Sequence, residues 1–110
     1  MREEIVLFKI HRGLRERNHY EATRKHWRMN KNRIEHIKYA VGIDQGKVVC
    51  VFEPTSWEVV EEGEYKGKLK FEGTDAGHEI FNKLQLAQGQ LLKKFGRGNP
   101  VAYISLSEID

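Results

Sequence analysis

Four side chains near the N-terminus combine aromatic, hydroxyl and guanidinium groups at the spacing of one helix face. They are Tyr20, Thr23, Arg24 and Trp27; Thr23 and Arg24 are adjacent, and each lies three or four positions from both Tyr20 and Trp27. An indole offers a face on which a nucleobase stacks, worth roughly 1–3 kcal/mol per base, and a guanidinium offers a planar fork for a phosphate or a base edge. We predict that Trp27 and Arg24 contact such a ligand, with the hydroxyls of Tyr20 and Thr23 as secondary contacts. The structural alternative is that Trp27 fills the end of the core, Arg24 pairs with an acidic neighbour and Thr23 caps the helix.

Basic residues are concentrated around these four positions. Between residues 12 and 38, nine of the chain's nineteen Lys and Arg residues face three acidic residues, a balance of +6, whereas residues 39–110 carry eight basic and eleven acidic residues, a balance of −3. The nine are Arg12, Arg15, Arg17, Arg24, Lys25, Arg28, Lys31, Arg33 and Lys38. A cluster with so little acid nearby repels itself unless an anion is bound. We predict that Arg28, Lys31 and Arg33 contact phosphates without reading sequence; the alternative is a solvated surface.

Two further segments have weaker signals. Trp57 has no basic neighbours in the sequence, so core packing is favoured over the alternative of a second aromatic wall in a binding pocket. Residues 96–99, Gly-Arg-Gly-Asn, could cradle a phosphate with backbone N–H groups, but they precede Pro100 and fit an ordinary turn better.

Motifs for enzyme chemistry are weak. The five histidines include no pair at metal-ligand spacing, no serine lies in a nucleophile elbow, and no Gly-rich loop with a following Lys is present. We therefore predict a binding module rather than an enzyme, with no metal and no cofactor. The single cysteine, Cys50, lies in an apolar run and is predicted to be a buried, inert thiol.

The composition predicts one domain over residues 1–110. The chain is 39% hydrophobic and 32% charged, which is typical of a globular protein with a single core. We find no apolar run long enough for a membrane span or for a secretory signal, so the expected compartment is the cytoplasm.

The order of elements predicts an α+β fold. Strands are expected at residues 5–10, 39–43, 47–52, 56–60, 65–72 and 101–106, and helical segments at 20–27, 31–37, 77–84 and 87–95. Asp44-Gln45-Gly46 is typical of a hairpin turn, Pro54 is expected to end the strand before it, and Gly73 to end the strand at 65–72. The resulting domain is a mostly antiparallel, curled sheet with short flanking helices.

Short strings across the chain also resemble a family of small bacterial and phage proteins. They are Tyr20-Glu-Ala-Thr-Arg24-x-x-Trp27, Tyr39-Ala-Val-Gly-Ile-x-x-Gly46, residues 48–52 followed by Trp57, Phe71-x-Gly73, and Gly98-Asn99-Pro100-Val-x-Tyr103. The likeness covers roughly residues 4–106, and such domains occur alone or beside restriction-type and other defence genes. The order of elements is similar to the PUA-like superfamily of small β-barrels, which includes RNA-binding and modified-base-binding domains. The resemblance implies a PUA-like pseudo-barrel and a binding module, and it brings no catalytic residues.

These observations together predict non-catalytic binding of a nucleic acid or a nucleotide. A modified or flipped base held in a pocket is the most specific version, because extracting one base needs both stacking and edge contacts. Two other classes fit the same residues. One is a sponge for a free signalling nucleotide in the conflict between phage and host. The other is a protein-interaction module whose basic face meets an acidic partner.

Overall fold

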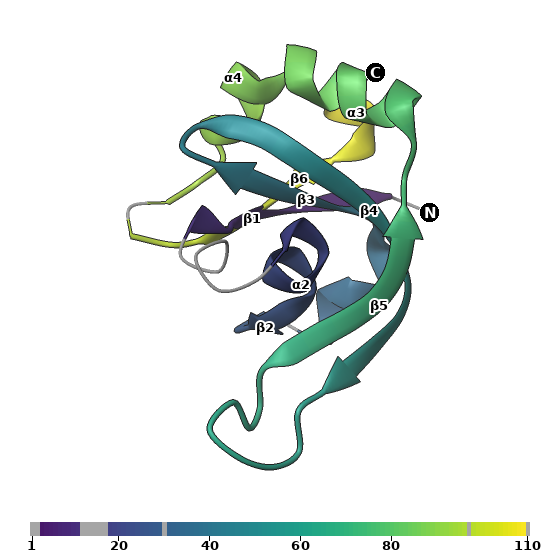
Figure 1. Cartoon of the computed structure of the whole chain (residues 1–110). Helices are drawn as coiled ribbons and strands as arrows, with labels where there is room; N and C mark the ends of the chain where they lie inside the picture. Colours follow the sequence, from purple (N-terminus) through teal and green to yellow (C-terminus); the bar gives the residue numbers. More distant parts are fainter. Residues whose placement is uncertain (1–2, 12–17, 30, 97, 110) are drawn as a thin grey trace.

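A computed structural model describes residues 3–11, 18–29, 31–96 and 98–109 (Figure 1). Its framework is a six-stranded mixed sheet in the order β2-β5-β4-β3-β1-β6. The strands are β1 (Glu4–Lys9), β2 (Lys25–Trp27), β3 (Ile37–Asp44), β4 (Lys47–Val59), β5 (Leu69–Asp75) and β6 (Val101–Ser105). The helices are α2 (His19–Arg24), α3 (His78–Leu86) and α4 (Gln88–Leu92), with 3₁₀ turns η1 (Lys31–His36) and η2 (Leu106–Glu108). Strands β1 and β3 run parallel and the other pairs are antiparallel, so the predicted α+β class with a mostly antiparallel sheet is confirmed.

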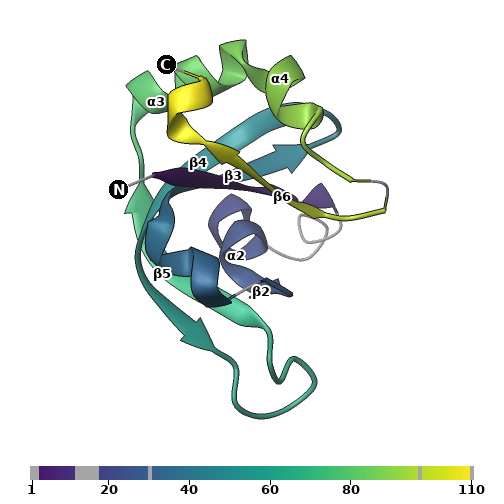
Figure 2. The ribbon, with the colours of Figure 1, turned by 180° about the vertical axis from the view of Figure 1, so that it is seen from behind.

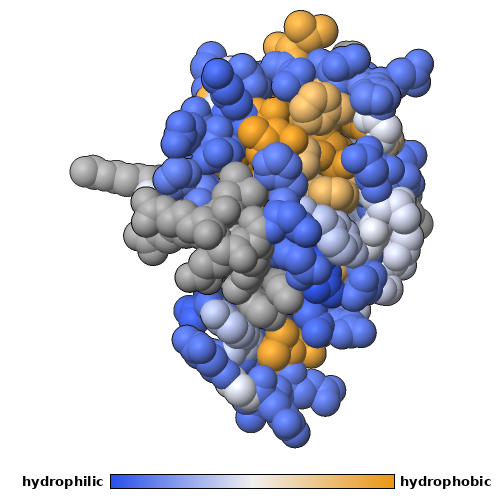
Figure 3. All heavy atoms as spheres, in the orientation of Figure 1, coloured by the Kyte–Doolittle hydropathy of each residue, from blue (hydrophilic) through white to orange (hydrophobic). Residues whose placement is uncertain are grey.

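The apolar run of β1 is explained by burial on both faces of the sheet. Because successive side chains of a strand point to opposite faces, Ile5 and Leu7 pack with one core cluster while Val6 and Phe8 pack with the other. The first cluster lies under α3 and α4, and the second lies against α2, on the other side of the sheet (Figures 1 and 2). On the surface, hydrophobic atoms gather below α3, while most of this side is hydrophilic (Figure 3).

The sheet curls around α2. Trp27 of β2 stacks on Phe8 of β1 with the ring centroids 4.3 Å apart, although three strands lie between β2 and β1 in the order. The curl is visible in the bend of β4 and β5 beneath α2 (Figure 1). Strands β2 and β6 remain at the two ends of the order, so the described strands do not close into a barrel.

Several predicted elements are confirmed. The first and last strands, the two helical segments near the C-terminus and the central hairpin occur where the sequence places them, within a few residues. The hairpin turn consists of Gln45 (φ 51°) and Gly46 (φ 79°), the two positive φ angles of a type I′ turn. The predicted helix at 31–37 is a 3₁₀ turn over Lys31–His36, and its expected N-cap, Asn30, lies outside the described residues.

Two predicted strand ends are wrong. Pro54 does not end its strand, since β4 continues to Val59. The β3 ladder stops at Phe52 and a bulge follows Pro54, so the missing N–H of this proline costs no ladder hydrogen bond to β3. Gly73 does not end β5 either. It lies opposite Pro54, where a Cβ would be 2.6 Å from the carbonyl oxygen of Glu53, so glycine permits the close approach of the two strands.

The predicted helix at 20–27 is also too long. Helix α2 ends at Arg24, and the next three residues form β2, in which Lys25 pairs with Lys70 and Trp27 pairs with Leu69. The helical spacing of the sequence is therefore overridden by strand pairing with β5.

Candidate nucleic-acid interface

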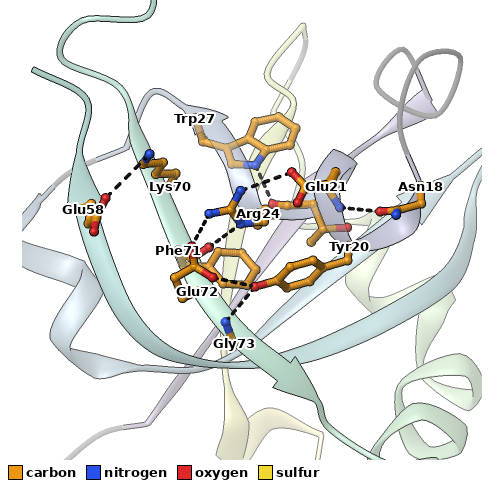
Figure 4. Close-up of polar contacts among 11 residues, drawn as sticks. Asn18, Tyr20, Glu21, Arg24, Trp27, Glu58, Lys70, Phe71, Glu72 and Gly73 are labelled. Atoms are coloured by element: carbon orange, nitrogen blue, oxygen red, sulfur yellow. Dashed lines mark hydrogen bonds and ion pairs between the residues drawn. The ribbon is translucent and has the colours of Figure 1, made fainter. Parts of the chain in front are cut away.

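Arg24 lies at the centre of a polar network between α2 and β5 (Figure 4). Its Nε donates to the carbonyl oxygen of Phe71 at 2.9 Å, Nη1 donates to Glu21 Oε2 at 3.1 Å, and Nη2 donates to Glu72 Oε1 at 2.5 Å. The Arg24 side chain is 10% exposed, whereas those of Glu21 and Glu72 are 34% and 58% exposed. We call Tyr20, Glu21, Arg24 and Glu72 the Arg24 cluster.

Electrostatics keep this guanidinium charged. Burial lowers the pKa of Arg24, but the hydrogen bond and charge of Glu21 and the charge of Glu72 more than offset it, so the pKa is raised overall. All three nitrogens already donate to protein acceptors. The groups that the Arg24 cluster presents to solvent are mainly carboxylates, which repel a phosphate.

Tyr20 ties the same helix to the edge of β5. Its hydroxyl donates to Glu72 Oε2 at 3.2 Å and accepts from the backbone N–H of Gly73 at 3.1 Å. Strand β2 pairs only with Leu69 and Lys70. Tyr20 and Arg24 therefore hydrogen-bond to the edge of β5 beyond the end of β2.

Thr23 is fully buried beneath this network. Its hydroxyl donates to the carbonyl oxygen of His19 at 2.7 Å and lies 3.3 Å from Cys50 Sγ. Burial raises the pKa of the Cys50 thiol, and hydrogen bonds from Thr23 and the Gly42 backbone only partly oppose it. The expectation of a buried thiol at Cys50 is confirmed.

The two tryptophans occupy different environments. Trp27 is half-buried: its Nε1 donates to the carbonyl oxygen of Thr23 at 2.7 Å, and its ring lies nearly parallel to Phe8, at an angle of 12°. Trp57 is half-buried against Phe71, with centroids 5.1 Å apart. Trp57 thus packs on the β4–β5 pair.

The remaining cations that we predicted as phosphate contacts follow Trp27 closely in the sequence. Arg28 and Lys31 are exposed and have no ion-pair partner among the residues that the structure describes. Arg33 donates from Nη2 to Glu4 at 2.7 Å, and its guanidinium carbon lies 3.9 Å from the ring centre of Tyr103. Trp27, Arg28, Lys31 and Arg33 lie on β2, on η1 and between these two elements, and we call this set the aromatic–basic face. Arg12, Arg15 and Arg17 lie outside the described residues, as does the side chain of Lys25.

Sequence reasoning missed the partners of these side chains. Phe8, Glu72 and Tyr103 come from β1, β5 and β6, each 19 or more positions from the residue that it contacts. No local spacing points to them. Tyr103 does belong to one of the strings on which the family resemblance rests, which is the one available signal.

Comparison with known protein families, curated protein sequences and solved structures finds no match to this chain. Among the described residues, no group of three or more His, Cys, Asp or Glu side chains is arranged to hold a metal ion. In that same part of the chain, each helix is too short or too polar to cross a membrane.

Proposed function

We propose that this protein binds a nucleic acid or a nucleotide, without catalysing a reaction on it, through the aromatic–basic face. The observation that supports this most is a half-buried indole, Trp27, followed closely in the chain by two exposed cations, Arg28 and Lys31, with no ion-pair partner among the described residues. Stacking on an aromatic ring and charge contacts to phosphates are the two interactions on which sequence-tolerant nucleic-acid binding relies.

In this proposal each residue has a distinct role in binding. Trp27 stacks on a base, while Arg28 and Lys31 contact phosphates. Arg24 acts as a positioning residue, because its hydrogen bonds to Glu72 and Phe71 fix α2 on β5 and so fix the strand that carries Trp27. This differs from the direct ligand contact expected from the sequence, since each of the three Arg24 nitrogens donates to a protein acceptor and the side chain is 10% exposed.

We extend the proposal to the fold family and the compartment. A curled, mostly antiparallel sheet with a helix on its inner side supports a PUA-like assignment, and such domains include readers of RNA and of modified bases. A flipped or modified base against Trp27 remains the most specific form of the proposal. The cytoplasm is the compartment in which such a ligand is met.

A salt-dependent titration tests the proposal. A short single-stranded oligonucleotide of mixed sequence should quench tryptophan fluorescence, and the Trp27→Phe variant should lose most of the signal because Trp57 contacts Phe71 and is not part of the proposed binding face. The double variant Arg28→Ala with Lys31→Ala should weaken binding and reduce the slope of log K against log salt by up to about 0.7 per lost phosphate contact. The matched control, Lys47→Ala with Lys93→Ala, removes two exposed lysines outside residues 12–38 and should leave the slope unchanged.

Two results would favour other functions, and a third would refute the proposed one. Tight binding of mononucleotides or cyclic dinucleotides that survives salt indicates a nucleotide sponge. Capture of an acidic protein, with no response to any nucleotide, indicates a protein-interaction module. If neither the oligonucleotide nor the nucleotides change the signal, the proposed function is wrong.

A further inference from the structure

Two planar groups are stacked on aromatic rings at the inner side of the curled sheet. Trp27 lies on Phe8, with 4.3 Å between ring centroids, and the Arg33 guanidinium lies on Tyr103, 3.9 Å from the ring centre. Phe8 is buried in the cluster on this side of the sheet, and both Trp27 and Tyr103 pack against that cluster.

Strand register places these two stacks side by side. Strands β1 and β6 pair antiparallel, with Val6 opposite Tyr103 and Phe8 opposite Val101. Phe8 and Tyr103 are therefore diagonal neighbours on one face, and such neighbours lie about 7–8 Å apart. In Figure 2, β2 and the turn η1, in blue, lie below β1 and β6, so the elements that carry Trp27 and Arg33 lie on the same side of this strand pair.

Both planar groups are held in one orientation before any ligand arrives. The edge of the Arg33 guanidinium is fixed by its ion pair with Glu4, whose side chain is 12% exposed, while the Arg33 side chain itself is 42% exposed. The Trp27 indole is fixed by its hydrogen bond to Thr23 and stays half-buried. Groups ordered in this way lose little conformational entropy when they bind a ligand.

We propose that Trp27 and Arg33 are two stacking platforms for neighbouring bases of one extended single strand. This rests on the proposed function and narrows its ligand. Bases of one strand in a duplex are about 3.4 Å apart along the helix axis, whereas the rings beneath the two platforms are diagonal neighbours about 7–8 Å apart. We therefore infer that bases on the two platforms are unstacked from each other. The site therefore takes single-stranded nucleic acid of at least two nucleotides in preference to a duplex or a mononucleotide. An Arg guanidinium plane serves as a stacking surface for unstacked bases just as an aromatic ring does.

A length series is the direct test. A mononucleotide, a dinucleotide, a single-stranded hexamer and the same hexamer as a duplex are compared by Trp27 fluorescence or by competition. We expect the dinucleotide to bind about 5- to 150-fold more tightly than the mononucleotide, the factor that one additional stacked base supplies. We expect the duplex to compete more weakly than the single-stranded hexamer.

A conservative variant separates stacking from charge at Arg33. Arg33→Lys keeps the positive charge but loses the planar group, so it should weaken dinucleotide binding several-fold and leave mononucleotide binding and the salt slope unchanged. Arg28→Lys makes the same change at a proposed phosphate contact that keeps its charge, so any loss of affinity should be shared by the mononucleotide and the dinucleotide.

Several outcomes would overturn the inference. Equal affinity for the mononucleotide and the dinucleotide, equal binding of the duplex, or an equal loss of both small ligands in Arg33→Lys would refute the two platforms and leave the proposed function standing. If Arg33→Lys fails to fold because Glu4 loses its partner, the length series on the unaltered protein decides alone. If no ligand of the series binds, both proposals are wrong.

Discussion

Arg24 shows how a residue suited to ligand binding can be used by the fold. Its three nitrogens donate to Phe71, Glu21 and Glu72, and its side chain is nearly buried. The exposed carboxylates of this network can be hydrated when the arginine is removed, but the Phe71 carbonyl then loses a buried donor. The residue is thus expected to matter more for stability than for direct contact with a ligand.

Removing the arginine should therefore destabilise the protein. We expect Arg24→Ala to lower the free energy of unfolding by about 1–3 kcal/mol, the range for losing hydrogen bonds to partly exposed charged groups and one buried carbonyl. Arg28→Ala, at an exposed residue with no partner in the described part of the chain, should change it by less than about 0.5 kcal/mol. Urea denaturation of both variants checks this, and equal effects would contradict the assigned roles.

The sequence predicted which residues gather at this site but not what they contact. Helical spacing correctly brought Tyr20, Thr23 and Arg24 onto one short element, and Trp27 stays beside them through its bond to Thr23. The partners Glu72 and Phe8 lie on distant strands, and no sequence pattern specifies which strands become neighbours in a curled sheet. Those distant partners decide which cations make contacts within the described part of the chain, as Arg24 does, and which have no ion-pair partner there, as with Arg28.

At the level of elements, side chains of α2 hydrogen-bond to the part of the β5 edge that strand β2 does not cover. Strand β2 covers only the first two residues of β5, and the Tyr20 hydroxyl and Arg24 Nε then hydrogen-bond to Gly73 and Phe71. Exposed sheet edges are sites of unwanted pairing, and side chains that occupy their backbone groups protect them. The motif that the sequence marks as functional thus also protects this edge of the sheet.

Deleting one hydroxyl tests this role. Tyr20→Phe leaves the ring in place but removes the acceptor of the Gly73 N–H, so we expect a loss of about 1–2 kcal/mol in unfolding free energy. Hydrogen exchange at the Gly73 amide should become faster. Tyr39→Phe serves as the control, because the Tyr39 hydroxyl has no hydrogen bond within the described part of the chain and the side chain is half-buried as well. An unchanged exchange rate at Gly73 would argue against edge protection by α2.

Strand ends were harder to predict than strands. Pro54 and Gly73 are ordinary breakers of local structure, and each nevertheless lies inside a strand, paired with the other across β4 and β5. A bulge and a close backbone contact make both residues suitable there, and neither feature is visible in one segment alone. The alternation of apolar residues predicted the centres of the strands, whereas pairing with neighbouring strands determined where each strand ends.

For the whole molecule, the other end of the sheet is protected in the same manner. Asn99 Oδ1 accepts from the Val101 N–H at 2.9 Å, and Glu108 Oε2 accepts from the Ser105 N–H at 3.2 Å. These two groups lie at the two ends of β6. Both terminal strands of the sheet order are therefore flanked by side-chain hydrogen bonds that limit the addition of another strand.

Removing these groups should promote self-association. We expect the double variant Asn99→Ala with Glu108→Ala to form larger species as concentration rises, because the freed edge of β6 can pair with a second copy. Sedimentation velocity over a concentration series measures this. The control, Glu79→Ala with Asn82→Ala, removes the same side-chain types from exposed positions of α3 and should sediment as the unaltered protein does. Identical sedimentation of the two variants would show that this edge needs no protection.

The position of β1 between β3 and β6 has a consequence for biosynthesis. This strand leaves the ribosome before the other five, yet one of its neighbours, β6, is the last of the six to be made. Until then, one edge of a segment that is almost entirely apolar has no partner. From the synthesis of β1 until that of β6, the nascent chain therefore carries a hydrophobic strand with one unpaired edge, a feature that makes partly folded chains prone to aggregation.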